Sequence, residues 1–77
     1  MIDDDFTGPE FQMHKHSVLL DGHQTSVSLE GAFWDGLVAI AKARGQSINT
    51  LVTEIDHART TNLSSAIRVF VLRHQAQ

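Results

Sequence analysis

The residues before position 30 alternate in polarity with a period of two. Every second residue from 24 to 29 is apolar or β-branched, a pattern that predicts a half-buried β-strand. Its apolar side is expected to carry Thr25, Val27 and Leu29, and its polar side Gln24, Ser26 and Ser28. The preceding run, His16–Leu20, connects to it through Asp21-Gly22. Asp-Gly favours a hairpin, because both central residues of a type I′ turn need positive φ. One continuous strand through Gly22 is the alternative.

Between Glu30 and Arg44 the apolar spacing changes to three and four residues, which predicts a helix. Its apolar stripe consists of Trp34, Leu37, Ile40 and Ala41, with Phe33 beside it. Lys42 and Arg44 lie in the last turn, where cations interact favourably with the helix dipole. Gly45 follows at the position where a left-handed glycine commonly ends a helix.

Two further helices are expected after Gly45. Ser47 is a favourable N-cap for the first of them, whose apolar stripe is Ile48, Leu51, Val52 and Ile55. The apolar pattern lapses at residues 59–62, where Asn62 can cap a last helix that carries Leu63, Ala66, Ile67, Phe70 and Val71. The expected order is therefore a strand or hairpin followed by helices, an α+β fold.

The chain has 77 residues and no cysteine. A chain of this size forms at most one domain with a small core, and oligomerisation is the remaining aid to stability when disulfides and thiolate metal sites are excluded. Residues 1–13 are expected to form an acidic, flexible arm, and residues 14–77 the folded domain. No apolar run approaches the roughly 18 residues that span a bilayer, and the acidic N-terminus differs from a signal peptide. We expect a cytoplasmic protein without membrane contact.

The formal net charge is −3, so the chain as a whole lacks the basic character of most nucleic-acid-binding modules. The charge is uneven, because four of the nine acidic residues lie in the first ten positions. The five acidic residues that remain face six Lys or Arg, which leaves the rest of the chain close to +1. This balance is compatible with DNA binding but does not favour it.

The order of strand and helices, with its short gaps, resembles the ribbon-helix-helix family of bacterial DNA-binding proteins. The resemblance covers residues 24–56 and rests on Ser26-Val27-Ser28-Leu29, on Trp34, Leu37, Ile40 and Ala41, on Gly45-Gln46-Ser47, and on Leu51-Val52 and Ile55. The wider run from Asp21-Gly22-His23 to Asn62-Leu63-Ser64-Ser65 resembles a bacterial subfamily largely without assigned function.

This resemblance implies an intertwined homodimer in which each chain contributes a strand to an antiparallel ribbon. A single strand is also unstable alone, so the strand count points to a dimer as well. We expect no stable folded monomer. The dimer core is expected to contain Val27, Leu29, Trp34, Leu37, Ile40, Leu51, Val52 and Ile55, with Trp34 largely buried against Leu37 and the helix around Val52.

In relatives that bind DNA, the ribbon lies in the major groove of double-stranded DNA. The resemblance implies base contacts by Gln24, Ser26 and Ser28, because glutamine can bond an adenine edge and serine hydroxyls can donate or accept. It also implies phosphate contacts at the start of the second helix, by Ser47, Ile48 and Asn49, with Arg44 nearby. The function expected first is that of a transcriptional regulator.

The second hypothesis is a protein-interaction or oligomerisation module that keeps the dimer without binding DNA. Gln24 stands where many DNA-binding relatives carry Arg or Lys, and the polar face of an antiparallel sheet can simply be solvated. A hairpin would give the dimer four strands, and at about 4.8 Å per strand this sheet approaches the roughly 12 Å width of the major groove. The apolar surplus at residues 70–72 also favours an additional contact.

No catalytic or metal-binding pattern accompanies these elements. His14, His16 and His23 could converge across a hairpin, but they lack the spacing of a recognised metal motif. Ser64-Ser65 has no accompanying base and orienting group, so we interpret it as the first turn of a helix. We therefore expect neither an enzyme nor a metal or other cofactor.

Overall fold

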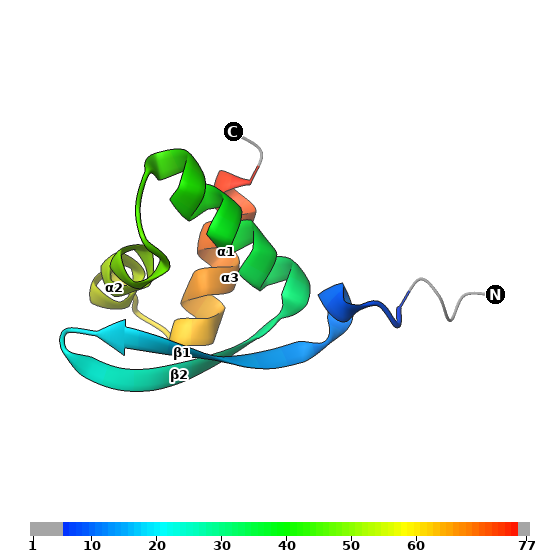
Figure 1. The fold of residues 1–77 in the computed structure, drawn as a ribbon, viewed down its shortest axis with the longest axis horizontal. Helices are drawn as coiled ribbons and strands as arrows, with labels where there is room; N and C mark the ends of the chain where they lie inside the picture. The colour runs from blue at the N-terminus through cyan, green and yellow to red at the C-terminus, as the bar shows by residue number, and fades with distance from the viewer. Residues whose placement is uncertain (1–5, 76–77) are drawn as a thin grey trace.

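The computed structural model describes residues 6–75 and consists of a two-stranded sheet with three helices on one side of it (Figure 1). Its elements are the 3-10 helix η2 (Pro9–Phe11), the strands β1 (Met13–Leu20) and β2 (His23–Glu30), and the helices α1 (Gly31–Arg44), α2 (Ile48–Ala58) and α3 (Leu63–His74). The α+β class and the order of elements predicted from the sequence are confirmed. Within residues 6–75, no helix has the length and apolar character needed to cross a membrane.

A two-residue turn joins β1 to β2 and confirms the hairpin over the single continuous strand. Asp21 has φ 51° and Gly22 has φ 82°, so both central residues are left-handed, as a type I′ turn requires. The strands are antiparallel, and Leu20 pairs with His23 directly beside the turn. The length of the turn thereby determines every pair further along the hairpin.

The hairpin has one covered and one open face. Val18, Val27 and Leu29 point toward the helices and are buried. The open face consists of the cross-strand pairs Lys15–Ser28, Ser17–Ser26 and Leu19–Gln24. Because side chains alternate along a strand, the polar side expected for residues 24–28 is the side turned away from the helices.

The helices begin and end where their capping residues predict. The side-chain oxygens of Ser47 and Asn62 accept hydrogen bonds from the N–H groups of Thr50 and Ser65, at 3.0 and 2.8 Å. Gly45 ends α1 in the left-handed conformation, with φ 67°. These three residues separate α1, α2 and α3 as expected.

The core of the single chain contains residues from both strands and all three helices. Six of the eight residues expected in a dimer core are already buried within one chain, whereas Trp34 and Ile40 are partly buried. α3 and β1 complete this core with Ile67, Val71 and Val18, and Gly36 allows the close approach of α1 and α3. The buried set is Val18, Val27, Leu29, Leu37, Ala41, Leu51, Val52, Ile55, Ile67 and Val71.

Trp34 makes a contact with β1 that the sequence did not predict. Its ring stacks on the His16 ring of β1, with centroids 3.7 Å apart and planes 4° from parallel, and it remains partly exposed. Trp34 packs against the core of the single chain as a partly buried residue, and its larger burial in a dimer stays a prediction. α3 packs against α1 at Gly36, so the buried line of α1 runs through Gly36, Leu37 and Ala41, and Trp34 lies beside it.

The arm expected at residues 1–13 is folded against α1 from Pro9 onward. The carbonyl of Gln12 accepts a 2.9 Å hydrogen bond from the N–H of Gly31, and the Pro9 carbonyl lies so close to Gly31 that a Cβ at position 31 would clash with it. β1 begins at Met13, one residue before the expected domain boundary. The acidic residues 3–5 lie outside the described residues.

Candidate nucleic-acid interface

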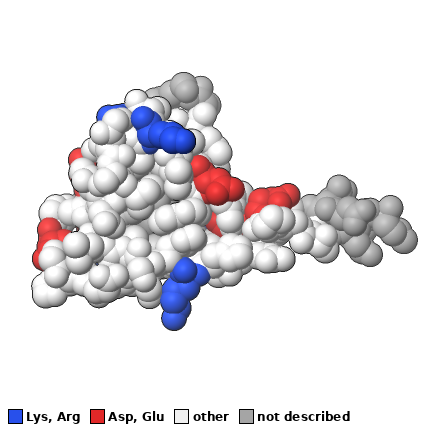
Figure 2. Space-filling model, in the orientation of Figure 1, with Lys and Arg blue, Asp and Glu red and all other residues white. Residues whose placement is uncertain are grey.

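The open face of the hairpin carries all three residues expected to contact bases. Gln24 and Ser26 are exposed, and Ser28 is partly buried. The register adds Lys15, which lies opposite Ser28 on the same face and is exposed. Figure 2 shows a basic side chain projecting from the sheet, and Lys15 is the only Lys or Arg in the two strands. Lys15 was not among the residues predicted to contact DNA, because its place on the open face follows from the residue-by-residue register of the hairpin.

The two edges of the sheet differ in their accessibility. At the edge of β1, the Leu19 N–H donates a 3.1 Å hydrogen bond to Oδ1 of Asn49, and α2 packs along the strand. At the edge of β2, the Ser28 carbonyl accepts a 3.0 Å bond from Oγ of Ser64. Among residues 6–75, no hydrogen bond covers the outer edge of β2 between residues 23 and 27. This stretch of β2 is open to another strand.

The start of α2 holds the residues expected to contact phosphate, but it uses their side chains within the chain. The Ser47 hydroxyl caps the helix, the Asn49 side chain binds β1, and Ile48 is partly buried. The first backbone N–H groups of a helix have no partner inside it, so they are the donors left for an anion. The bond from Leu19 to Asn49 holds this helix end beside the hairpin.

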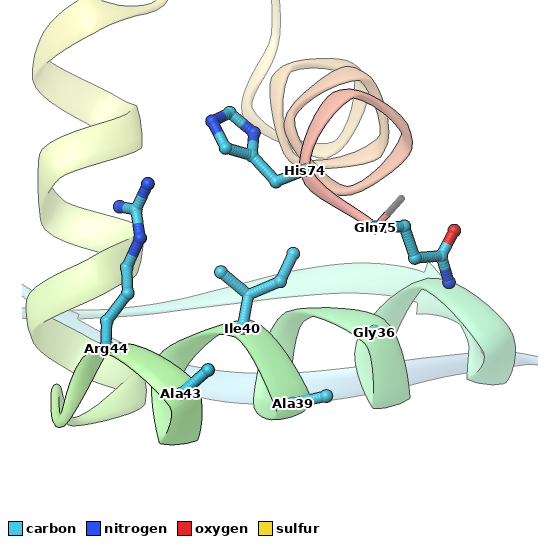
Figure 3. Close-up of a pocket in the computed structure, with 7 residues that line it drawn as sticks. All are labelled: Gly36, Ala39, Ile40, Ala43, Arg44, His74 and Gln75. Atoms are coloured by element: carbon cyan, nitrogen blue, oxygen red, sulfur yellow. The ribbon is translucent and has the colours of Figure 1, made fainter. Parts of the chain in front are cut away.

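Arg44 lies away from the open face, at the C-terminal end of α1, which points away from the sheet in Figure 1. Its guanidinium lies 5.2 Å from the centre of the Phe70 ring. Together with Ile40 and His74 it lines a hollow of about 320 Å³ between α1 and α3 (Figure 3). The structure thus brings together the residues on β2, but it does not bring Arg44 to them.

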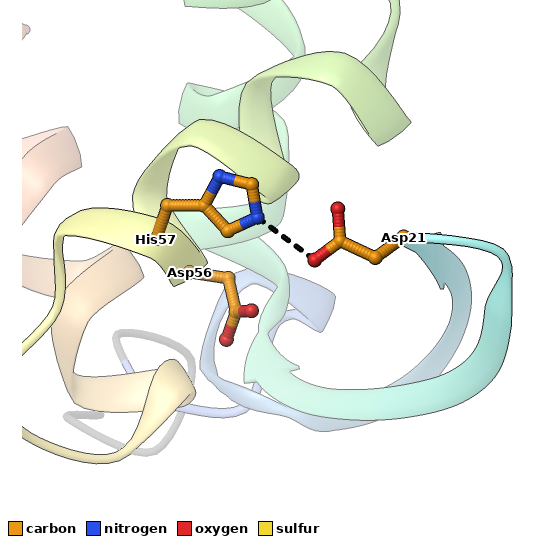
Figure 4. A group of neighbouring side chains, drawn as sticks. All are labelled: Asp21, Asp56 and His57. Carbon is orange, nitrogen blue, oxygen red and sulfur yellow. Dashed lines mark hydrogen bonds and ion pairs between the residues drawn. The ribbon is translucent and has the colours of Figure 1, made fainter.

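The hairpin turn is held against α2 by a polar contact that was not expected (Figure 4). Nε2 of His57 lies 2.8 Å from a carboxylate oxygen of Asp21. This hydrogen bond, with the negative charge of Asp21, raises the pKa of His57. The contact joins the tip of the hairpin to the end of α2.

Asp56 completes a group of three potential metal ligands, all within 4.8 Å of one another, with Asp21 and His57. Its carboxylate is already bound by Nε of Arg59 at 2.7 Å. A guanidinium on one carboxylate opposes a cation there, and the contacts of all three side chains are accounted for by ion pairs within the chain. His14, His16 and His23 belong to no such group within residues 6–75.

The remaining charges near β2 are paired. Nε of Arg68 on α3 lies 2.8 Å from the Glu30 carboxylate at the end of β2. The hydrogen bond from Arg68 lowers the pKa of Glu30, so this acid stays ionised beside the open face. The negative charge at this end of the sheet is therefore balanced, and Lys15 supplies the positive charge of the face.

His16 occupies a different environment on the covered side of β1. Burial lowers the pKa of His16, and the neighbouring His14 lowers it further. Its Nε2 is buried and has no hydrogen-bond partner among the described residues. A neutral imidazole suits the stacked position against Trp34, because an ionised ring would lose solvation there.

Comparison with known proteins agrees with this arrangement. The ribbon-helix-helix domain family matches residues 13–75, which include both strands and all three helices. An uncharacterized protein from Bordetella pertussis Tohama I has a similar structure, with a TM-score of 0.75 and 31% sequence identity. The match covers 88% of this chain and 59% of that one, so this chain spans less than two thirds of its relative. No curated protein matches the sequence. The chain belongs to the ribbon-helix-helix domain family.

Proposed function

We propose that the protein is a homodimeric DNA-binding regulator that reads the major groove with the open face of its hairpin. The observation that carries the proposal is the exposure of Gln24 and Ser26 on a face that no other part of residues 6–75 covers. The family commonly binds DNA, which supports the same conclusion. Glutamine can make a bidentate bond with adenine, and serine hydroxyls can donate to or accept from base edges.

The open edge of β2 is where the second chain joins in this proposal. Asn49 and α2 occupy the edge of β1, whereas the outward backbone groups of Gln24 and Ser26 on β2 have no partner among residues 6–75. An exposed strand edge readily pairs with another chain. Pairing of two β2 strands would give a sheet in the order β1, β2, partner β2, partner β1, with the base-contacting residues of both chains near its centre.

Selection of tight-binding duplexes from a mixed pool, followed by fluorescence anisotropy, tests the proposal. We expect a two-fold symmetric site to be selected. Gln24→Ala should weaken its binding by about 5- to 150-fold, the equivalent of one good base contact of roughly 1–3 kcal/mol. Gln12→Ala is the matched control, because this exposed glutamine precedes β1 and is outside the strand pairs. Failure of the wild-type protein to bind any duplex at low salt refutes the proposal.

Sedimentation across a concentration series tests the dimer separately. The expected result is a dimer, or a multiple of it, at micromolar concentration. The substitution Thr25→Lys places a charge where two β2 strands would meet, so it should shift the protein toward monomer. A cooperatively folded monomer at all concentrations would contradict a ribbon formed through β2.

Exposed apolar residues favour a second candidate, a module that assembles further through protein contacts. Val69 and Leu72 on the outer side of α3 are 53% and 62% exposed. The pair Val69→Gln and Leu72→Gln should reduce any assembly beyond the dimer while leaving duplex binding unchanged. If the wild-type protein assembles beyond the dimer but binds no duplex, this second function replaces the first.

A further inference from the structure

We infer that β1 contacts the DNA backbone: Lys15 and Ser17 bind phosphates at the rims of the major groove while β2 lies inside it. The inference rests on the proposed function and extends it. It assigns a role to the outer strand of the hairpin, which otherwise makes the sheet too wide for the groove.

The width of the four-stranded sheet determines where each strand lies relative to the walls of the groove. Strands in a sheet are about 4.8 Å apart, so in the four-stranded order the axes of the inner strands lie about 2.4 Å from the midline and those of the outer strands about 7 Å. The major groove is about 12 Å wide, so its walls lie about 6 Å from its midline. The two β2 strands therefore fit between the walls, whereas each β1 strand lies over a wall, where the phosphates are.

The side chains on the open face of β1 have the chemistry that this position needs. Lys15 and Ser17 are both exposed, and they lie opposite Ser28 and Ser26 of β2. An ammonium and a hydroxyl are both donors to phosphate oxygens. Among residues 6–75, no acidic side chain pairs with Lys15, so its charge is available to a phosphate.

Gln24 and Lys15 then have different roles: Gln24 on the inner strand contacts bases, and Lys15 on the outer strand contacts phosphates. The inner strand presents neutral polar groups, which suit base edges, and the outer strand presents the positive charge. Phosphate contacts fix position and contribute affinity without reading sequence. Each dimer would place two copies of Lys15 on opposite walls of the groove.

Titrations of Lys15→Gln against salt test the inference. Binding is measured by anisotropy with the selected duplex and with a mixed-sequence duplex, over a range of about 50 to 200 mM salt. Because each phosphate contact contributes about −0.9 to the slope of log K against log salt, loss of two contacts should make this slope less steep by about 1.8. The variant should weaken binding to both duplexes by the same factor. Ser17→Ala should give a smaller uniform loss without a change of slope.

Lys42→Gln is the control, since Lys42 is an exposed lysine near the C-terminal end of α1, away from the sheet. It should leave affinity and slope unchanged, and equal melting temperatures of the two variants exclude unfolding. A changed sequence preference in Lys15→Gln would place this side chain on bases and overturn the inference. An unchanged salt slope in Lys15→Gln would also overturn the inference. In that case, weaker binding of the selected duplex by Gln24→Ala would still support the proposed function. If the wild-type protein binds no duplex, the proposed function fails first.

Discussion

Substitution of Gly36 tests the packing of α3 against α1. A Cβ at position 36 would lie 2.7 Å from Cγ1 of Val71, too close for two carbon atoms. In Gly36→Ala, the gain in helix propensity is about 1 kcal/mol, whereas overpacking of a core costs about 1–3 kcal/mol. We expect the second effect to dominate, so the variant should lose up to about 2 kcal/mol of the free energy of unfolding.

The combination with Val71→Ala determines whether this contact is responsible. Val71 is 1% exposed, and removal of its two methyl groups should cost roughly 2 kcal/mol. In the double variant, the new methyl of residue 36 can occupy the space that the valine leaves. The double variant should therefore be more stable than the sum of the single effects by about 1–3 kcal/mol.

Urea denaturation followed by circular dichroism at one fixed protein concentration measures these free energies, because the stability of a dimer depends on concentration. Ala39→Gly is the calibration, since this exposed residue of α1 should show a propensity effect of about 1 kcal/mol. A more stable Gly36→Ala, or single effects that add within about 0.5 kcal/mol, would show that α1 and α3 do not meet at this contact.

Three further predictions concern the polar contacts. Because the pKa of His57 is raised in the fold, its bond to Asp21 should stabilise the protein below the ordinary histidine pKa and lose this effect as pH rises through the raised value. Asp21→Asn keeps a residue that tolerates the turn but removes the charge beside His57. Its melting temperature should lie below that of the wild type at about pH 5.5 and approach it at about pH 8.5, on either side of the histidine range. An equal difference in melting temperature at both pH values would contradict the bond. The pKa of His16 is lowered in the fold, so its contribution to stability depends on pH in the opposite direction to that of His57. The stability of the protein should fall as pH drops through the range between the ordinary histidine pKa and the lowered value. The fluorescence of Trp34, the only tryptophan, should report this titration and should cease to titrate there in His16→Gln; a midpoint above the ordinary histidine pKa would be inconsistent with burial. Ser47→Ala should cost about 1 kcal/mol in urea denaturation through loss of the cap of α2, whereas Ser47→Thr should retain most of it.

The elements and their limits could be predicted because their signals lie close together in the chain. Asp21 and Gly22 form a type I′ turn by their own backbone preferences, and Ser47 and Asn62 cap helices through bonds to residues three positions later. These contacts need no distant partner. Alternation along residues 24–29 likewise predicted that Gln24 and Ser26 face away from the covered side.

The place of Lys15 on the open face follows from the length of the hairpin turn. A two-residue turn pairs Leu20 with His23, and counting outward from this pair places Lys15 opposite Ser28. The register follows from the hairpin alone, because side-chain positions in paired strands repeat every two residues. The charged residue of the open face could therefore have been found once the hairpin was chosen over the single strand.

The sequence by itself determined the turn, the caps, the three helices and the polar side of β2, all of which depend on residues within a few positions of one another. Only the tertiary structure decided which apolar residues of α1 are buried and which polar side chains are free. The approach of α3 at Gly36 leaves Trp34 beside His16, and the docking of α2 joins Asn49 to Leu19, 30 positions away. Such outcomes depend on how closely whole elements pack, and no periodicity within a single element encodes that distance.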